Sequence, residues 1–176
     1  MNARSFLTAL LLFLAIAPQA LASGDGLDPV PKPPIPPRPW GAIGGQAFVS
    51  QIAGLSFSAR ESRIREELQR GNVPGFARRF VPVNVSAVIS GITHRGTFYV
   101  MPDYLAIGSN IDFFRTPMSP LVAQPVLDLY GCTWPTRKMV NAIWQAAPVK
   151  LAPIQLSPNT YDITAVTTFY LHHTLI

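Results

Sequence analysis

The sequence predicts an α+β fold, in which a small antiparallel sheet has about three helices packed on one side. Alternating apolar and polar residues over 81–89 predict that the first strand of the sheet is half-buried, with one face in the core and the other in solvent. The segments 58–71, 119–131 and 136–147 each begin near a capping residue and carry spaced apolar residues, which predicts the three helices. A chain of 176 residues is long enough to bury one core of this kind.

The first predicted helix begins with Ser58-Ala59-Arg60-Glu61, which has the form of a capping box. Ile64 and Leu68 lie four residues apart and form its apolar face, and the charged residues around them form a solvated surface. Gly71 is expected to end this helix, because glycine adopts the left-handed conformation of a helix C-terminus without strain.

The strand over 81–89 is expected to form a hairpin with a return strand over 97–101. Gly91 and Gly96 bracket the turn region between the two strands, which places His94 in an exposed turn. A short third strand is expected over 104–107.

The second predicted helix has Ser119 as its N-cap and Pro120 at its first position, where the missing N–H costs nothing. Gly131 ends it, and Pro125 is expected to kink it or delay its start. The third helix runs from the N-cap Thr136 to Ala147. The remaining segments, 149–151 and 163–170, are predicted to be strand or loop.

Residues 1–22 have the three parts of a cleavable signal peptide. Arg4 supplies the positive charge, residues 6–17 form an apolar run, and Ala20-Leu21-Ala22 offers small residues at a cleavage site. The apolar run is too short to span a membrane, which takes about 20 residues. The sequence therefore predicts a secreted protein, periplasmic or extracellular, with no transmembrane segment in its mature chain.

The segment after the signal peptide, 23–45, is predicted to be a proline-rich linker. Residues 28–40 contain seven prolines, which exclude a helix or a central strand and favour an extended polyproline conformation. The folded domain is then expected to cover 46–176.

The composition favours an anionic partner. Without Arg4 the chain carries 13 basic and 9 acidic residues, a net charge of about +4, and only three of the basic residues are lysines. A secreted, arginine-rich chain favours an anionic cell-wall or extracellular polymer over nucleic acid, although so small a charge can also serve solubility alone. With one cysteine and three scattered histidines, the sequence indicates no metal site and no cofactor.

Four stretches resemble a family of secreted proteins that has no established activity. They are residues 79–83, Pro102–Ser109 (PDYLAIGS), Gly131–Val140 (GCTWPTRKMV) and 149–151. Members of that family are usually longer, so the resemblance implies that this chain corresponds to their N-terminal part and is shortened at its C-terminus.

A cell-envelope-associated hydrolase that uses a cysteine nucleophile is the favoured functional hypothesis. Cys132 lies near the predicted start of a helix and near Arg137, and both features lower the pKa of a thiol. His172 or His173 would act as the general base and Asp103 would orient it, as in a catalytic triad. The alternative interpretation is that Cys132 is a small buried core residue.

A non-catalytic module of the cell envelope is the other hypothesis. Arg137, Lys138 and Arg115 would bind an anionic glycan or another envelope component, and Trp134 would offer a flat surface on which a sugar ring could stack. The same residues could equally be a core aromatic with basic neighbours that extend their charged ends into solvent.

Overall fold

The computed structural model describes residues 14–15 and 30–176. The predicted signal peptide therefore lies outside the described residues, except for the two residues of β1. The helices are α1 (Gly45–Ile52), α2 (Phe57–Gln69), α3 (Pro120–Leu129), α4 (Arg137–Ala146) and α5 (Val166–Leu175), with a 3₁₀ turn at Gly75–Arg78. The strands are β1 (Leu14–Ala15), β2 (Val81–Ile89), β3 (Ile92–Val100), β4 (Ala106–Gly108), β5 (Phe113–Arg115) and β6 (Cys132–Thr133).

The strands form two antiparallel sheets. One has the order β2-β3-β1-β6, and the other pairs β4 with β5. The predicted α+β class with small antiparallel sheets is confirmed. The described residues contain five α-helices rather than three, because α1 and α5 were not predicted.

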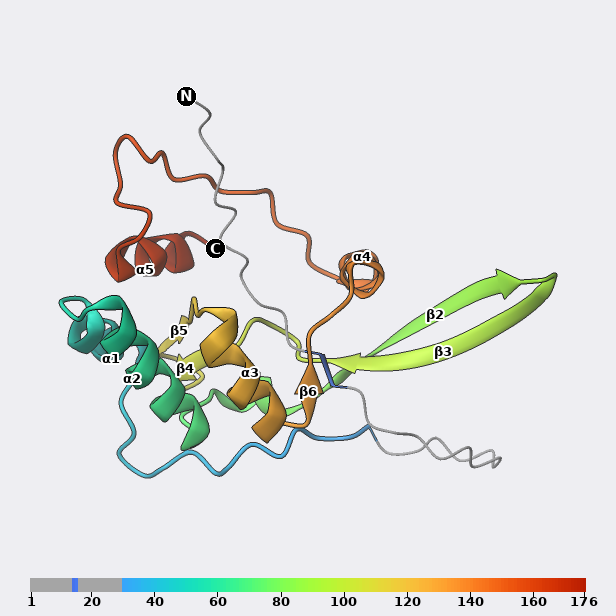
Figure 1. The fold of residues 1–176 in the computed structure, drawn as a ribbon, viewed down its shortest axis with the longest axis horizontal. Helices are drawn as coiled ribbons and strands as arrows, with labels where there is room; N and C mark the ends of the chain where they lie inside the picture. The colour runs from blue at the N-terminus through green and yellow to red at the C-terminus, as the bar shows by residue number, and fades with distance from the viewer. Residues whose placement is uncertain (1–13, 16–29) are drawn as a thin grey trace.

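The helices are divided unequally between the two sheets. α1, α2 and α5 contact the β4–β5 pair, and α3 packs on α2, whereas α4 contacts β2. Figure 1 shows the resulting shape, with most helices gathered at one end and the β2–β3 hairpin projecting from the other. The main core lies at the helical end, where the largest fully buried side chains include Phe48, Ile52, Ile64, Leu68, Phe114, Leu127 and Tyr130.

The proline-rich residues 30–44 lie against this core, so this part of the predicted linker belongs to the folded domain. Ile35 is buried in the main cluster. The Arg78 guanidinium donates hydrogen bonds to the carbonyl oxygens of Ile35 and Pro36, the latter at 2.8 Å. Prolines have no backbone N–H to donate but keep their carbonyl oxygens as acceptors. The several N–H groups of an arginine side chain can therefore satisfy two neighbouring carbonyls of such a segment.

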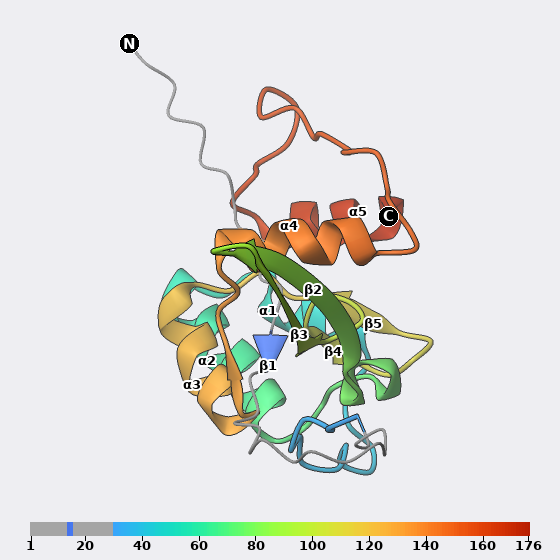
Figure 2. The same cartoon turned by 90° about the vertical axis from the view of Figure 1, so that its right-hand side faces the viewer.

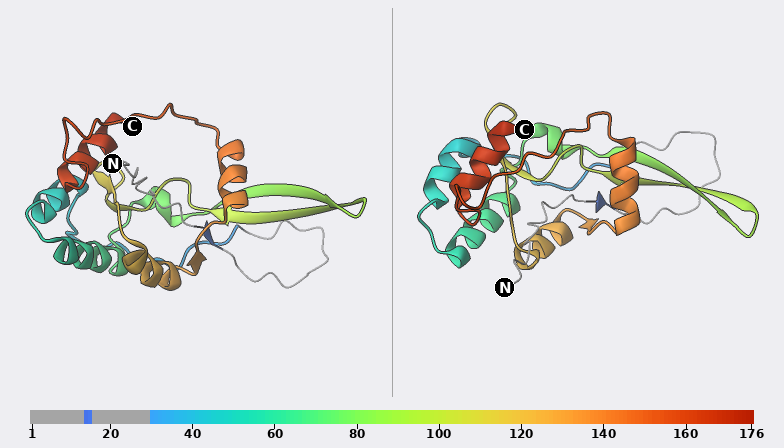
Figure 3. Two further views of the ribbon diagram at one scale, coloured as in Figure 1. Left: turned by 45° about the horizontal axis from the view of Figure 1, so that its top comes forward. Right: turned by 90° about the horizontal axis from the view of Figure 1, so that it is seen from above.

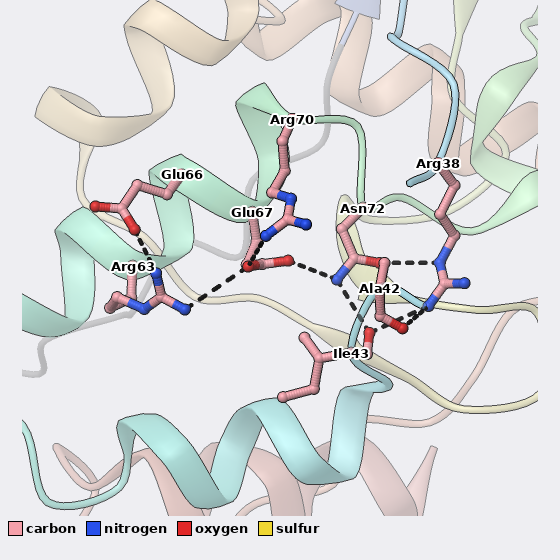
Figure 4. Close-up of polar contacts among 8 residues, drawn as sticks. All are labelled: Arg38, Ala42, Ile43, Arg63, Glu66, Glu67, Arg70 and Asn72. Atoms are coloured by element: carbon pink, nitrogen blue, oxygen red, sulfur yellow. Dashed lines mark hydrogen bonds and ion pairs between the residues drawn. The ribbon is translucent and has the colours of Figure 1, made fainter. Parts of the chain in front are cut away.

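A buried polar network fixes the end of the same segment (Figure 4). The Arg38 Nε donates to Asn72 Oδ1 at 2.9 Å, and the Asn72 amide donates to Glu67 Oε2 at 2.7 Å. Glu67 is also ion-paired with Arg63 and Arg70 on its own helix. Since both Glu67 and Asn72 are buried, these partners supply the hydrogen bonds that burial would otherwise remove.

The predicted hairpin is present, but its turn lies elsewhere. β2 has the predicted bounds, whereas β3 begins at Ile92 because Ser90 and Gly91 alone form the turn, with φ of 51° and 78°. Such a two-residue turn matches the twist of the strands. His94 and Gly96 consequently lie within β3, where Gly96 is paired with Val85.

The prediction of a half-buried first strand was wrong for most of its length. Val83 is the one buried residue of β2, and the outer part of the hairpin extends beyond every helix (Figure 3). α4 packs near the base of the hairpin, against Val83, Phe98 and Val100. Figure 2, which looks along the hairpin, shows the axis of α4 running across it. The half-burial that alternation predicts therefore occurs only where α4 covers the strands.

The predicted helices occur with small shifts. α2 begins at Phe57, capped by the Ser56 hydroxyl rather than by Ser58. α3 and α4 follow Ser119 and Thr136 as predicted, and the Thr136 hydroxyl accepts a hydrogen bond from the Met139 N–H at 3.3 Å. The prediction of strand or loop over 163–170 was wrong, because α5 begins at residue 166.

Candidate functional site

Cys132 lies in β6 and is buried, with 9% of its surface exposed. Its thiol donates a hydrogen bond to the carbonyl oxygen of Tyr130, 3.3 Å away. Burial raises the pKa of this thiol to about 12, so the thiol is protonated at neutral pH. A cysteine nucleophile needs the opposite shift.

The two C-terminal histidines lie in α5 and contact other parts of the chain. The His172 Nε2 is 3.0 Å from the carbonyl oxygen of Ile154, and because a carbonyl only accepts, Nε2 is the protonated nitrogen. His173 contacts Arg115 and the rings of Phe113 and Tyr170. Among the described residues no hydrogen bond joins either histidine to Cys132, so the structure does not assemble the predicted triad.

Asp103 does meet His173, but through Arg115. The Arg115 guanidinium contacts the Asp103 carboxylate through two nitrogens, with the shorter distance 2.7 Å, and its Nη1 is 3.1 Å from the His173 Nδ1. Burial and the charge of Arg115 lower the pKa of His173, which keeps the ring neutral and able to accept this hydrogen bond. The cluster thus attaches α5 to β5 through the contacts of Arg115 with Asp103 and His173.

A groove opens between the middle of the hairpin and α4. Its volume is about 520 Å³, which lies within the usual range for small-molecule sites. Its apolar lining comes from Val85 and Phe98 of the hairpin and from Met139 and Ala142 of α4; its polar lining includes His94, Arg95 and Lys138. No acidic side chain lines it.

The predicted binding residues divide between this groove and other places. Lys138 lines the groove, and Arg137 precedes it on the exposed first turn of α4. Trp134 packs partly against the main core, with its indole N–H donating to Gln124 Oε1. Arg115 lies in the cluster with Asp103 and His173, on the other sheet.

The far end of α4 carries an exposed aromatic side chain. Trp144 is 61% exposed, and the Lys150 ammonium lies 5.2 Å from the centre of its ring. Lys150 also donates hydrogen bonds to the carbonyls of Gln145 and Ala147, which completes the C-terminus of the helix. α4 therefore exposes part of its apolar face, and none of its residues is buried.

Sequence reasoning missed His94 and Arg95 as groove residues. The strand register places Ser86 opposite Arg95 and Ala87 opposite His94, in the middle of the hairpin. A signal for this surface exists in the sequence, because residues 68–102 and 129–161 contain no aspartate or glutamate. These two acid-free stretches supply the hairpin and α4.

Within residues 14–15 and 30–176, no group of three or more histidine, cysteine, aspartate or glutamate side chains is placed to hold a metal ion. No helix of that part of the chain is long and apolar enough to cross a membrane. The chain matches no protein-family model, and no curated protein or solved structure is significantly similar to it.

Proposed function

We propose that this protein is a non-catalytic binding module and that its groove between the β2–β3 hairpin and α4 takes an anionic amphiphile of the cell envelope. The observation that carries the proposal is the composition of the groove: an apolar lining, with basic residues and no carboxylate. A ligand that matches both the apolar and the basic lining of the groove has a negatively charged group joined to a hydrocarbon portion. An uncharged sugar chain would leave the basic side chains without partners.

The charges at the start of α4 support an anionic ligand. Arg137 and Lys138 occupy the first two helical positions, where the helix dipole is positive and cations are unfavourable. The N-terminus and the two cations together produce a positive potential beside the groove. Residues that reduce the stability of a helix are expected at places where the binding of a ligand requires them.

The contacts of Cys132 give no support to the hydrolase hypothesis. A thiol that is buried, protonated and hydrogen-bonded to a carbonyl has neither a base to activate it nor access to substrate. Of the two hypotheses, the binding module is the one that the groove favours.

Calorimetric titration with dodecyl phosphate, below its micelle concentration, tests the proposal. The protein should bind this probe and not dodecyl maltoside, which has the same chain and no charge. Lys138→Ala should weaken binding about two- to fivefold, as expected for a solvent-exposed charge contact. Arg65→Ala, which removes an exposed arginine from α2, is the matched control.

Two results would contradict the proposal. Equal binding of the charged and neutral probes would mean that the groove does not select for charge. Equal binding by the Lys138 and Arg65 variants would place the anion somewhere else on the protein. Ala142→Trp provides an independent check, because it fills the groove without altering any charge and should abolish binding.

A further inference from the structure

The end of the β2–β3 hairpin exposes a group of large apolar side chains. Val88, Ile89 and Ile92 are 69%, 59% and 63% exposed, around the turn at Ser90 and Gly91. We call these three residues the hairpin tip. Contiguous exposed apolar residues on a projecting element mark an interaction surface rather than a chance exposure.

The hairpin tip continues the apolar lining of the groove. Ile89 is paired with Ile92, and Ala87 and Val85 follow on the same face of the hairpin, because alternate residues of a strand point to one side. Val85 and Ala87 both line the groove. One apolar stripe therefore runs from the groove to the tip.

Basic residues lie behind the hairpin tip. Arg95 is three residues along β3 from Ile92, which is about 10 Å at the usual rise of a strand, and it lies on the opposite face of the hairpin from Ile92. His94 lies between them, and Lys138 lines the same groove from α4. Amphipathic elements at a membrane surface insert their apolar part by about 5–10 Å, at which depth Arg95 would meet the lipid headgroups.

From this geometry we infer that the hairpin tip inserts into an anionic lipid bilayer and that Arg95 and Lys138 contact the headgroups. The inference rests on the proposed function, since the groove beside the tip then holds part of one anionic lipid. Charge favours this occupant over a second copy of the chain: the hairpin and α4 contain no acidic residue, so two copies docked through this surface would bring like charges together.

Vesicle flotation tests the inference. The full protein should float with vesicles of equal parts phosphatidylcholine and phosphatidylglycerol, and not with phosphatidylcholine alone, and added salt should release it. Replacing both isoleucines of the tip (Ile89→Ser with Ile92→Ser) should reduce the bound fraction at least about tenfold. Ile111→Ser, which changes an even more exposed isoleucine in the loop between β4 and β5, is the control.

A fluorescent label at the tip gives a second measurement. Because Cys132 is buried, Ile89→Cys provides the accessible thiol for an environment-sensitive dye. Its emission should shift to the blue on mixed vesicles and stay unchanged on neutral ones. A label on Ile111→Cys should report water in both cases.

The outcomes separate the two proposals. If dodecyl phosphate binds but the tip variant floats like the wild type, or the dye at position 89 stays in water, membrane insertion is refuted and the binding module stands. If dodecyl phosphate does not bind while the protein floats through its tip, the groove proposal fails and a lipid-binding hairpin remains. If neither probe binds, both proposals are overturned.

Discussion

A substitution in the first turn of α4 offers a test that separates the binding of the ligand from the stability of the fold at a single position. Lys138 is the second residue of the helix, and the partial positive charge of a helix N-terminus opposes a cation there by about 0.3–1 kcal/mol. Lys138→Glu removes this repulsion and replaces it with an attraction of similar size. Since the side chain is exposed, the lower half of that range applies, and the total gain is about 1 kcal/mol.

The gain should be visible as a rise in the melting temperature. For a domain of this size, 1 kcal/mol corresponds to about 2–4 °C. Thermal unfolding followed by circular dichroism at low salt measures it, and calorimetry with dodecyl phosphate on the same sample measures binding. We expect Lys138→Glu to be more stable than the wild type and to lose its affinity for the probe.

Neutral variants complete this test. Lys138→Gln should produce about half of each effect, and Arg65→Gln, in the middle of α2, should produce neither. A lower melting temperature for Lys138→Glu would show that Lys138 stabilises α4 and would remove the argument that its charge serves a ligand. Unchanged binding would show that the groove does not recognise the anion through this residue.

Three further predictions concern the core and the α5 contact. Cys132 should react with iodoacetamide at pH 8 only after unfolding, because its pKa is about 12; rapid labelling of the native protein would revive the thiol as a candidate nucleophile. The free energy of unfolding should be highest above about pH 6.5 and should fall as the pH drops toward the lowered pKa of His173, because the unfolded chain then binds more protons than the folded one. Urea unfolding at several pH values should show this fall in the wild type. In His173→Phe only the acid dependence that the carboxylates cause in both proteins should remain. Gly71→Ala should destabilise the fold by more than about 1 kcal/mol, because φ is +82° and an added Cβ would lie 2.1 Å from the Pro36 carbonyl oxygen; urea unfolding that matches the wild type would refute this.

Helix ends were predictable because their determinants are local. The Thr136 hydroxyl caps α4 through contacts within one turn, and Gly131 follows α3 with φ of 62°. α5 was missed because its first residues, Val166 to Tyr170, include β-branched and aromatic side chains that favour strands. Packing decides otherwise: Val166 is buried against the main core, and Tyr170 packs on Phe114.

Only the part of the candidate site that lies on α4 could be predicted from the sequence. Lys138 is recognisable from its place beside a helix cap, but its neighbour in the groove, Arg95, is more than 40 residues away in the sequence, and no spacing relates the two. Cys132 illustrates the opposite error. The nearby cations and helix start suggested a reactive thiol, and burial, which a single sequence does not reveal, outweighs both.

The two-residue strand β1 lies within residues 1–22, which the sequence predicts to be a cleavable signal peptide. Leu14–Ala15 pairs with Tyr99–Val100 of β3 on one side and with Cys132–Thr133 of β6 on the other. If export removes residues 1–22, the precursor loses a strand from inside its sheet, and β3 and β6 are left about 10 Å apart, two strand spacings, with unpaired backbone groups facing each other. Maturation would then be a change of fold as well as of length: either the gap closes and draws α4 toward the sheet, or it stays open as an edge that a strand from another molecule could complete.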